Sequence, residues 1–503
     1  MLLAEIVDAS ARVTATRSRL AKVEILAEVL GHAAPAELEV ATAYLSGVLR
    51  QRRTGLGWRS TREAPPAADE PSLEVLEVDA VFTDLASLSG PGSRSVREST
   101  AASLFGRATL AEQRWLVGAI TGNVRQGASD ALVQEALAKL TGIPVAAVRS
   151  AAMLAGSTRA VVAIAVTQGE AGLAEVGLQV GRAVLPMLAA SEPDPAAAWE
   201  RIGADRVAVE WKLDGIRLQA HKDGDRVLLA TRTLEDITDR LPEVVEVVRS
   251  LPAQRAVIDG EALAVGPDGR PRPFQETASR TASGSGVAIT PYFFDLLHLD
   301  GEDLLDRPAS ERADRLAALV PEPHRVPREV VGSADEVARV FDAAVAAGQE
   351  GVVVKSLATA YAAGRRGAGW VKVKPVHTLD LVVLAVEEGS GRRKGWLSNI
   401  HLGARDPEGG FVMLGKTFKG MTDEMLTWQT ERFTELMTER DDWVVHVRPE
   451  QVVEIAFDGL QRSSRYPGGL ALRFARVIRY RDDKTADEAD TIDDVRRLAG
   501  PAD

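Results

Sequence analysis

The chain has 503 residues, 45% of them hydrophobic and 26% charged, which predicts a packed globular protein and excludes global disorder or a fibrous fold. At roughly 150 residues per domain, this length predicts about three domains. Cysteine is absent, which excludes disulfides, cysteine-ligated zinc, iron–sulfur clusters and thiol nucleophiles.

The formal net charge of −12 argues against a uniformly basic coat for nucleic acid. Residues 1–190 hold 18 Lys and Arg against 19 Asp and Glu, so nearly all the excess negative charge lies in residues 191–503. The kind of binding partner must therefore be inferred from local charged patches. The start of the chain is amphipathic with acids at Glu5 and Asp8, and no apolar run approaches the roughly 20 residues that span a bilayer. We expect neither export nor membrane insertion, and a cytoplasmic location.

Residues 1–190 are predicted to form an all-helical domain. Ala, Leu and Val recur at helical spacing, as in SDALVQEALAKLTG, where Ser129 is the expected N-cap and Gly142 the expected stop. A basic cluster surrounds Gly55, Gly57 and Trp58. Its members are Arg50, Arg52, Arg53, Arg59 and Arg62. This cluster is suited to contacting phosphates, and a solvated surface loop is an equally good interpretation.

Residues 191–375 are predicted to form an α+β domain. The stretch SEPDPAAAW, from Ser191 to Trp199, contains two prolines and is interpreted as a linker or a domain boundary. Alternating runs follow, with Asp223-Gly224 as a hairpin signal. Further strands are expected in AVIDGEALAV, TPYFFDLLHL and GVVVKS, and a capped helix is expected from Ser333 to Gly348.

Residues 376–503 show five short strand signals and one helical stretch around Met425 to Leu436. This pattern favours a small Greek-key β-barrel of the OB type, and a sandwich-like arrangement is the alternative. The segment from Asp482 to Asp494 is acidic and is expected to be solvated.

The sharpest chemical signal is Lys212-Leu213-Asp214-Gly215, preceded by Glu210 and followed by Arg217. Alone, this motif could be an ordinary strand lysine before a turn. Further pieces follow in order: Arg232, Asp259-Gly260-Glu261, Phe293-Phe294-Asp295, Glu350-Gly351, Lys372-Val373-Lys374 and Arg481-Asp482-Asp483-Lys484. The probability that all these pieces occur together in this order by chance is negligible, which disfavours an ordinary strand lysine.

A lysine amine becomes a nucleophile only when its pKa, ordinarily about 10.4, is lowered by desolvation or by nearby cations. Lys372 and Lys374 are candidates for such cations. Negative charge that develops on phosphoryl oxygens calls for preorganised cations, so Mg²⁺ is expected.

These residues resemble the motifs of the ATP-dependent DNA ligases, a family of covalent nucleotidyltransferases. The nucleophile motif is similar to VEWKLDGIR, the ribose and metal motif to VIDGEAL, the adenine-stacking motif to YFFDLL, the metal carboxylate motif to EGVVVKS, the phosphate-binding lysines to WVKVK, and the last motif to LRFARVIRYRDDK. The resemblance covers essentially the whole chain. It implies a helical DNA-binding domain, an adenylation domain and an OB-fold domain.

The resemblance implies that Lys212 attacks the α-phosphate of ATP and forms a lysyl–AMP intermediate with loss of pyrophosphate. AMP then moves to the 5′-phosphate of a nick, and the 3′-hydroxyl displaces it to close the strand. The implied partner is nicked double-stranded DNA, encircled by a monomer. The sequence does not distinguish replication, repair and recombination.

The resemblance also assigns roles to single residues. Phe294 is expected to stack on adenine while Phe293 packs in the core, since adjacent strand residues point to opposite faces. Glu210 resembles the adenine-reading position. Glu350 is expected to be a hard oxygen ligand of Mg²⁺, because the family places its metal carboxylate there. Glu261 is expected to be a second such ligand and to contact the ribose. AMP and phosphate contacts are implied for Arg217, Arg232, Arg366, Lys372, Lys374, Arg481 and Lys484.

Two of these assignments have alternatives. Arg365 lies beside Arg366 and could take its role, and Glu350 could be an acid at a helix end and not a metal ligand. The last motif is expected to swing onto the ATP site and away again. Lys416 and Lys419 are candidates for DNA backbone contacts or for a solvated turn. The seven histidines show no metal-ligand spacing.

Three rival functions remain. An NAD-dependent DNA ligase would carry a four-cysteine zinc module, which the absence of cysteine disfavours. An RNA ligase or capping guanylyltransferase would not need a helical domain of about 190 residues. A non-catalytic DNA-binding protein is disfavoured because Lys212, Glu261, Glu350 and Lys372 are all present.

Overall fold

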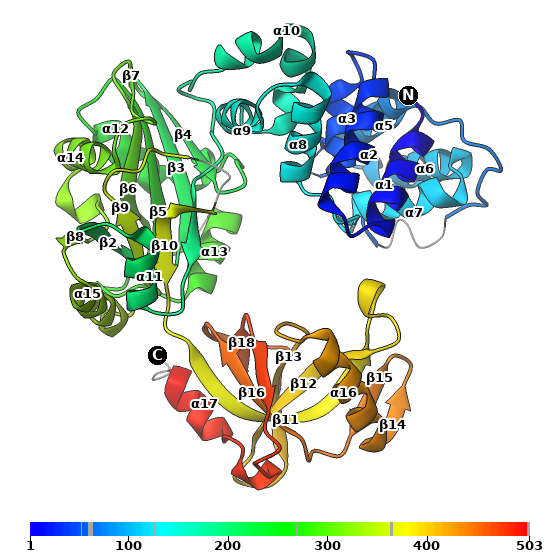
Figure 1. Cartoon of the computed structure of the whole chain (residues 1–503), viewed down its shortest axis with the longest axis vertical. Coiled ribbons are helices and arrows are strands. Elements are labelled where there is room, and N and C mark those ends of the chain that lie inside the picture. Colours follow the sequence, from blue (N-terminus) through cyan, green and yellow to red (C-terminus); the bar gives the residue numbers. More distant parts are fainter. Residues whose placement is uncertain are drawn as a thin grey trace.

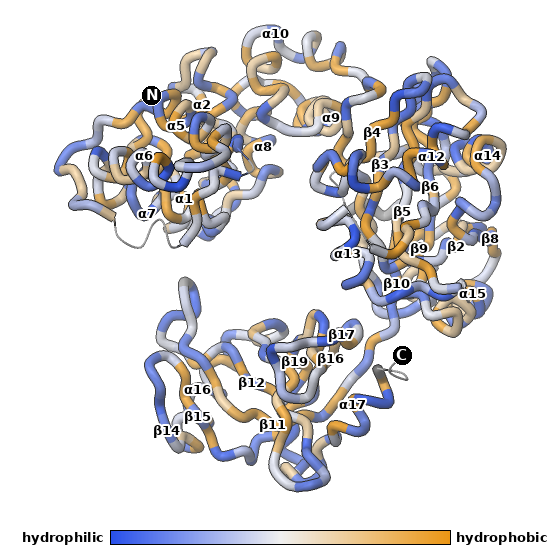
Figure 2. Tube along the Cα trace, turned by 180° about the vertical axis from the view of Figure 1, so that it is seen from behind, coloured by the Kyte–Doolittle hydropathy of each residue, from blue (hydrophilic) through white to orange (hydrophobic). Residues whose placement is uncertain are grey.

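The structure is a computed structural model that describes residues 1–51, 53–58, 64–124, 126–267, 269–284, 286–362 and 366–499. Three bodies follow one another along the chain and form an open C, with the helical and C-terminal bodies at its ends (Figure 1). Hydrophobic residues gather on the strands and on the inner sides of the helices (Figure 2). No helix among these residues is long and apolar enough to cross a bilayer.

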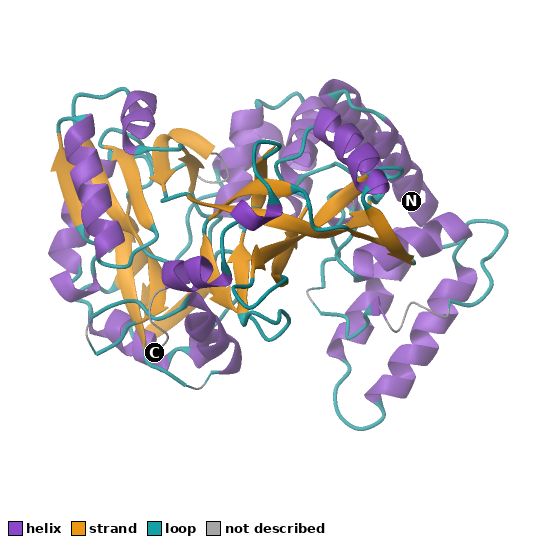
Figure 3. Ribbon diagram, turned by 90° about the horizontal axis from the view of Figure 1, so that it is seen from below, coloured by secondary structure: helices purple, strands orange, loops and turns teal. Residues whose placement is uncertain are grey.

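The first body is helical, as Figure 3 shows. Its α-helices are α1 (Leu3–Ala15), α2 (Arg19–His32), α3 (Leu38–Leu45), α5 (Val75–Ser87), α6 (Ser93–Arg107), α7 (Leu110–Ile120), α8 (Asp130–Thr141), α9 (Val145–Leu154) and α10 (Val162–Ala174). In α1 the buried residues Leu3, Ile6, Ala9 and Val13 form one stripe that packs into the core. The predicted limits of α8 are confirmed, with Ser129 at the N-cap and Gly142 in the left-handed conformation after the last turn.

The second body contains two five-stranded sheets. One has the order β1 (Leu188–Ser191), β10 (Arg366–Val373), β9 (Gly351–Ser356), β2 (Val207–Lys212), β8 (Arg328–Val331). The other has the order β4 (Arg226–Thr231), β3 (Ile216–Asp223), β5 (Arg255–Ala264), β6 (Ile289–Leu299), β7 (Glu302–Asp303). The predicted β3–β4 hairpin is confirmed, as are the predicted strands β5, β6 and β9.

Helices cover the outer faces of both sheets. On the first sheet lie α11 (Pro195–Ile202) and α15 (Ala334–Ala346), and on the second α12 (Pro242–Ser250), α13 (Phe274–Ser283) and α14 (Ala309–Leu319). Strand alternation directs the valines of β2 and β10, and Val352 and Val354 of β9, to the helices, so the intervening residues face the second sheet. This layering places the polar residues of three strands in the space between the sheets.

Two sequence-based expectations are wrong in this region. The segment interpreted as a linker contains the start of α11, because Pro195 occupies the first turn and Asp194 caps it by accepting from Ala197 N at 2.8 Å. The residues before 190 are not all helical either. Strand β1 begins at Leu188 and pairs in parallel with β10, a long-range partner that helical periodicity does not reveal.

The third body contains a seven-stranded sheet, a two-stranded sheet and two helices. The elements are β11 (His377–Glu388), β12 (Leu397–Arg405), β13 (Phe411–Thr417), α16 (Asp423–Glu435), β14 (Met437–Asp441), β15 (Val444–Val447), β16 (Val452–Phe457), β17 (Gly459–Arg462), β18 (Leu470–Arg473), β19 (Arg476–Tyr480) and α17 (Ile492–Ala499). The five predicted strands and α16 are confirmed, and four short strands were not predicted. Five strands of the seven-stranded sheet pair in the order β13-β12-β11-β15-β14, and this order does not close on itself. Strand β16 pairs with both β11 and β19.

The acidic segment near the end of the third body is not simply solvated, as the sequence suggested. Ile492 and Val495 of α17 are buried in the core of this body. Asp490 accepts a hydrogen bond from the backbone N of Asp380 at 2.7 Å. Buried apolar residues at helical spacing within an acidic stretch explain the difference.

Candidate active site

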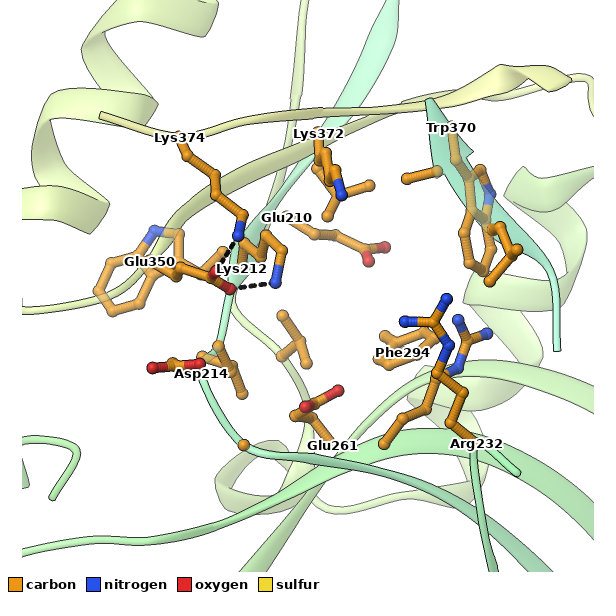
Figure 4. A pocket seen from close by; sticks show the side chains of 18 of the residues that line it. Glu210, Lys212, Asp214, Arg232, Glu261, Phe294, Glu350, Trp370, Lys372 and Lys374 are labelled. Carbon is orange, nitrogen blue, oxygen red and sulfur yellow. Dashed lines mark hydrogen bonds and ion pairs between the residues drawn. The ribbon is translucent and has the colours of Figure 1, made fainter. Parts of the chain in front are cut away.

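A cavity of about 430 Å³ lies between the inner faces of the two sheets of the second body (Figure 4). Nine of the predicted site residues line it: Glu210, Lys212, Arg217, Arg232, Glu261, Phe294, Glu350, Lys372 and Lys374. These side chains come from β2, β3, β5, β6 and β10 and from the segments after β4, before β9 and after β10. Both sheets are therefore needed to build the cavity.

A carboxylate joins two lysines at one end of the cavity. Glu350 contacts Lys212 through one oxygen and Lys374 through the other, as the dashed lines in Figure 4 show. Its backbone N also donates to the Lys212 carbonyl oxygen at 2.9 Å, so β2 and the start of β9 hold the pair in register. Burial lowers the pKa of Lys374, but the attraction of Glu350 and Asp458 outweighs it, and the pKa is raised.

Two glycines allow the backbones around Lys212 to approach closely. A Cβ on Gly215 would lie 2.5 Å from the carbonyl oxygen of Ala262. Gly351 has a positive φ of 133°, and a Cβ there would meet the Val373 carbonyl oxygen. The glycines that follow Asp214 and Glu350 in the sequence are therefore explained by packing.

Glu261 faces Arg217 across the β3–β5 ladder. Burial raises the pKa of Glu261 to about 7, against the opposing attraction of Lys212 and Arg217. Arg217 itself is fixed by Asp259, to which its Nε and Nη2 donate at 3.0 and 2.5 Å. A carboxyl group with a perturbed pKa beside two cations is typical of a functional site.

Aromatic rings form the other end of the cavity. Phe294 and Trp370 meet edge to face with centroids 5.9 Å apart. Lys355 Nζ lies 4.7 and 4.2 Å from the two ring centroids and pairs with Glu210 at 2.5 Å. Burial raises the pKa of Glu210, although Lys355 opposes the effect. The predicted split is confirmed in placement, because Phe293 is fully buried in the core while Phe294 lines the cavity.

Sequence reasoning missed Lys355 and Trp370 as cavity residues. Alternation could have found Trp370, which lies two residues from Lys372 on β10. It could not have found Lys355 from Glu350, because their positions differ by an odd number of residues and β9 begins only at Gly351. The side chain of Arg366, which was predicted to contact AMP, lies outside the described residues.

Arg481 and Lys484 do not line the cavity. Arg481 Nη1 and Lys484 Nζ both contact Asp380 Oδ2, at 2.9 and 2.6 Å. The third body instead contributes Arg473 and Phe474, which the sequence did not single out. Arg473 pairs with Asp214 at 2.6 Å across 259 positions of chain. No short-range sequence pattern indicates a contact between residues so far apart in the chain.

One member of the predicted basic cluster, Arg50, is engaged by acidic side chains. Arg50 is held by Asp79 and by Glu39, and Asp79 is itself buried. Arg52, Arg59 and Arg62 lie outside the described residues. Of the two lysines considered for DNA, Lys416 pairs with Glu387, and Lys419 Nζ lies 5.5 Å from the ring centroid of Phe474.

The donor chemistry at the cavity suits a magnesium ion bound together with phosphate. Mg²⁺ in such sites takes one or two carboxylates and fills its other positions with water and phosphate oxygens. Glu261 and Glu350 both line the cavity and supply such oxygens. Within the described part of the chain, no group of three or more His, Asp or Glu residues is placed to hold a metal ion.

Comparison with other proteins identifies the class of fold. Among the solved structures that the chain matches is Pmar-Lig_PreS3, with a TM-score of 0.62 at 18% identity, covering 95% of this chain and 99% of that one. Family models match in three segments: residues 49–138 match the DNA ligase N terminus, 186–374 the ATP dependent DNA ligase domain, and 393–484 the ATP dependent DNA ligase C terminal region.

Two relatives extend this match along the chain. A probable DNA ligase of Nocardioides sp. is 65% identical over 506 residues, covering 99% of both chains. Another from Beutenbergia cavernae is 61% identical over 512 residues, covering 99% of this chain and all of the relative. The chain belongs to the ATP-dependent DNA ligase family, which confirms the resemblance stated above.

Proposed function

We propose that this protein seals nicks in duplex DNA with ATP, joining a 3′-hydroxyl to a 5′-phosphate through lysyl–AMP and DNA-adenylate intermediates. The observation that carries the proposal is the placement of Lys212 in a cavity with Lys372, Lys374, Arg217 and the Phe294 ring. A purine fits the aromatic end, and phosphates fit the cationic end.

In the first step, the Lys212 amine attacks the α-phosphorus of ATP after losing a proton. A P–N bond forms as the P–O bond to pyrophosphate breaks. Lys372, Lys374, Arg217 and Arg232 are proposed to bind the phosphate oxygens, where fixed cations stabilise developing charge. Glu350 is proposed to align the Lys212 amine until nucleotide arrives, because its carboxylate already contacts that group.

At the base end, Phe294 is proposed to stack on adenine and Glu210 to accept from its amino group. Glu261 is proposed to accept from a ribose hydroxyl, and with Glu350 to hold Mg²⁺. The ion would supply positive charge beside the reacting phosphate. The remaining steps transfer AMP to the 5′-phosphate and release it when the 3′-hydroxyl attacks.

At the level of domains, we propose the limits 1–190, 191–375 and 376–503, the first binding DNA and the last having the OB fold. Arg481 and Lys484, held by Asp380 here, are proposed to reach the nucleotide when the third domain turns. We further propose that a monomer encircles the nicked duplex inside the cell. The open C of the three bodies agrees with encirclement (Figure 1).

The test is to incubate the protein with ATP labelled at the α-phosphate and Mg²⁺. The wild type should acquire covalent label, Lys212→Ala should not, and the surface variant Lys139→Ala should match the wild type. A nick-sealing assay with ATP, NAD or GTP on DNA and RNA strands then identifies nucleotide and substrate. Equal labelling of Lys212→Ala, or sealing only with NAD or only of RNA, contradicts the proposal.

A further inference from the structure

A buried tyrosine stands behind the wall of the cavity without lining it. Tyr361 is 3% exposed, and its ring meets Trp370 edge to face at 5.9 Å. Its hydroxyl donates to Asp259 Oδ2 at 2.7 Å and accepts from the backbone N of Met187 at 3.0 Å. One hydroxyl therefore ties together β5, the segment before β1 and the segment before β10.

Arg217 is held by the same two partners. Its Nε and Nη2 donate to Asp259, and its Nη1 donates to the Met187 carbonyl oxygen at 2.6 Å. Nη2 also donates to the Tyr361 hydroxyl oxygen, with the two heavy atoms 3.4 Å apart. These contacts use four of the five guanidinium hydrogens, which leaves one on Nη1 for a ligand in the cavity that Arg217 lines.

We propose that Tyr361 is a positioning residue for Arg217. By fixing Asp259 and Met187 from behind, the hydroxyl sets the plane of the guanidinium and so the direction of its remaining N–H. The same bond to Met187 steadies Leu188 and Ala189, which line the cavity. The inference rests on the proposed function, in which Arg217 contacts the nucleotide phosphate.

Tyr361→Phe removes the hydroxyl and keeps the ring against Trp370. A lost hydrogen bond to a charged network is worth about 1.5 kcal/mol or more, so the rate of Lys212 adenylation should fall roughly tenfold. Tyr44→Phe is the matched control. Its hydroxyl is buried in the helical body and has no hydrogen-bond partner in the described part of the chain, so adenylation should be unchanged.

A double-mutant cycle separates positioning from general stability. In an Arg217→Lys background, which lacks the planar fork, Tyr361→Phe should change the rate less than twofold. The four proteins of the cycle are also titrated with ATP, so that coupling is read from Kd as well as from the rate, and their Tm values are compared.

A wild-type rate and Kd in Tyr361→Phe would overturn the inference. So would an equal loss in both backgrounds together with a lower Tm, because that pattern belongs to a purely structural tyrosine. Failure of the proposed function is recognised separately, because the unmutated protein would then neither take up label nor seal a nick. The Kd cycle still decides the role of Tyr361 in that case.

Discussion

Phe293 and Phe294 are neighbours in β6 whose side chains lie in different environments. Phe293 is fully buried among the residues between the second sheet and its helices, and Phe294 lines the cavity. A single step along a strand therefore separates a residue that stabilises the fold from one suited to bind a base. The two positions offer a paired experiment.

Phe294→Leu should raise the KM for ATP in Lys212 adenylation by roughly tenfold, because stacking of a base on an aromatic ring is worth about 1–3 kcal/mol. Its Tm should change little. Phe293→Leu, the matched control, should lower the free energy of unfolding by about 1 kcal/mol and leave KM unchanged. Steady-state kinetics and thermal melts of both variants test this prediction. An unchanged KM in Phe294→Leu contradicts the stacking role.

The raised pKa of Glu261 predicts a pH dependence. Below about pH 7 the carboxyl of Glu261 takes up a proton in the nucleotide-free enzyme and loses the charge proposed to engage ribose and cation. We expect kcat/KM for adenylation to fall as pH decreases through about 7. In Glu261→Gln, kcat/KM should be lower and its fall near pH 7 should disappear. If the fall near pH 7 persists in the variant, it is caused by the titration of another group.

The same group affects stability with a defined sign. The pKa of Glu261 is higher in the folded protein, so its charge disfavours the folded state once pH exceeds the unfolded value near 4.5. The penalty grows until about pH 7, where it is on the order of 3 kcal/mol. In thermal melts, the Tm of Glu261→Gln should therefore rise relative to that of the wild type as the pH increases from 4.5 to 7. A Tm difference that does not change with pH would argue against a buried charge at Glu261.

At the scale of elements, the turn between β2 and β3 depends on Gly215. A Cβ there would lie 2.5 Å from the Ala262 carbonyl oxygen and 3.0 Å from Glu261 Cγ. Gly215→Ala should therefore push β5 and Glu261 away from Lys212, costing about 1–3 kcal/mol of stability and slowing adenylation more than tenfold. Gly177→Ala, where a Cβ meets open space, is the control, and equal adenylation rates in the two variants contradict the prediction.

Elements with a strong local pattern were predictable. Alternation and turn residues identified β3 to β6 and β9, and a serine cap with apolar spacing identified α15, where Ser333 accepts from Glu336 N at 3.2 Å. Short elements were missed. Strands β14, β15, β17 and β18 have four or five residues each, and β1 depends on its partner β10. Strand β19 is as short, and it was predicted because it lies in the longer run RFARVIRYR.

At the scale of the whole molecule, the third body contacts the cavity through two ion pairs. Arg473 pairs with Asp214, and Lys374 pairs with Asp458 at 3.4 Å. A hydrogen bond from Gln275 to the Arg462 carbonyl oxygen joins the same two bodies at 2.9 Å. These contacts are partly exposed, so salt should weaken them.

Arg473→Ala should loosen this docking in the absence of DNA. We expect a larger radius of gyration by X-ray scattering and faster proteolysis near residue 375, and the wild type at high salt should approach the variant. Arg479→Ala is the matched control, because its partner Glu454 lies within the third body. An unchanged radius in Arg473→Ala would show that the pair with Asp214 does not hold the two bodies together.

By itself, the sequence determined the order of the chemical motifs and the family they indicate, because each motif is a run of neighbouring residues. It also placed Phe293 and Phe294 on opposite faces, since strand period is a local property. Only the tertiary structure decided that Glu350 joins Lys212 to Lys374, and that Arg473 rather than Arg481 reaches the cavity. Such contacts depend on how sheets and bodies dock, and the residues that form them lie tens to hundreds of positions apart.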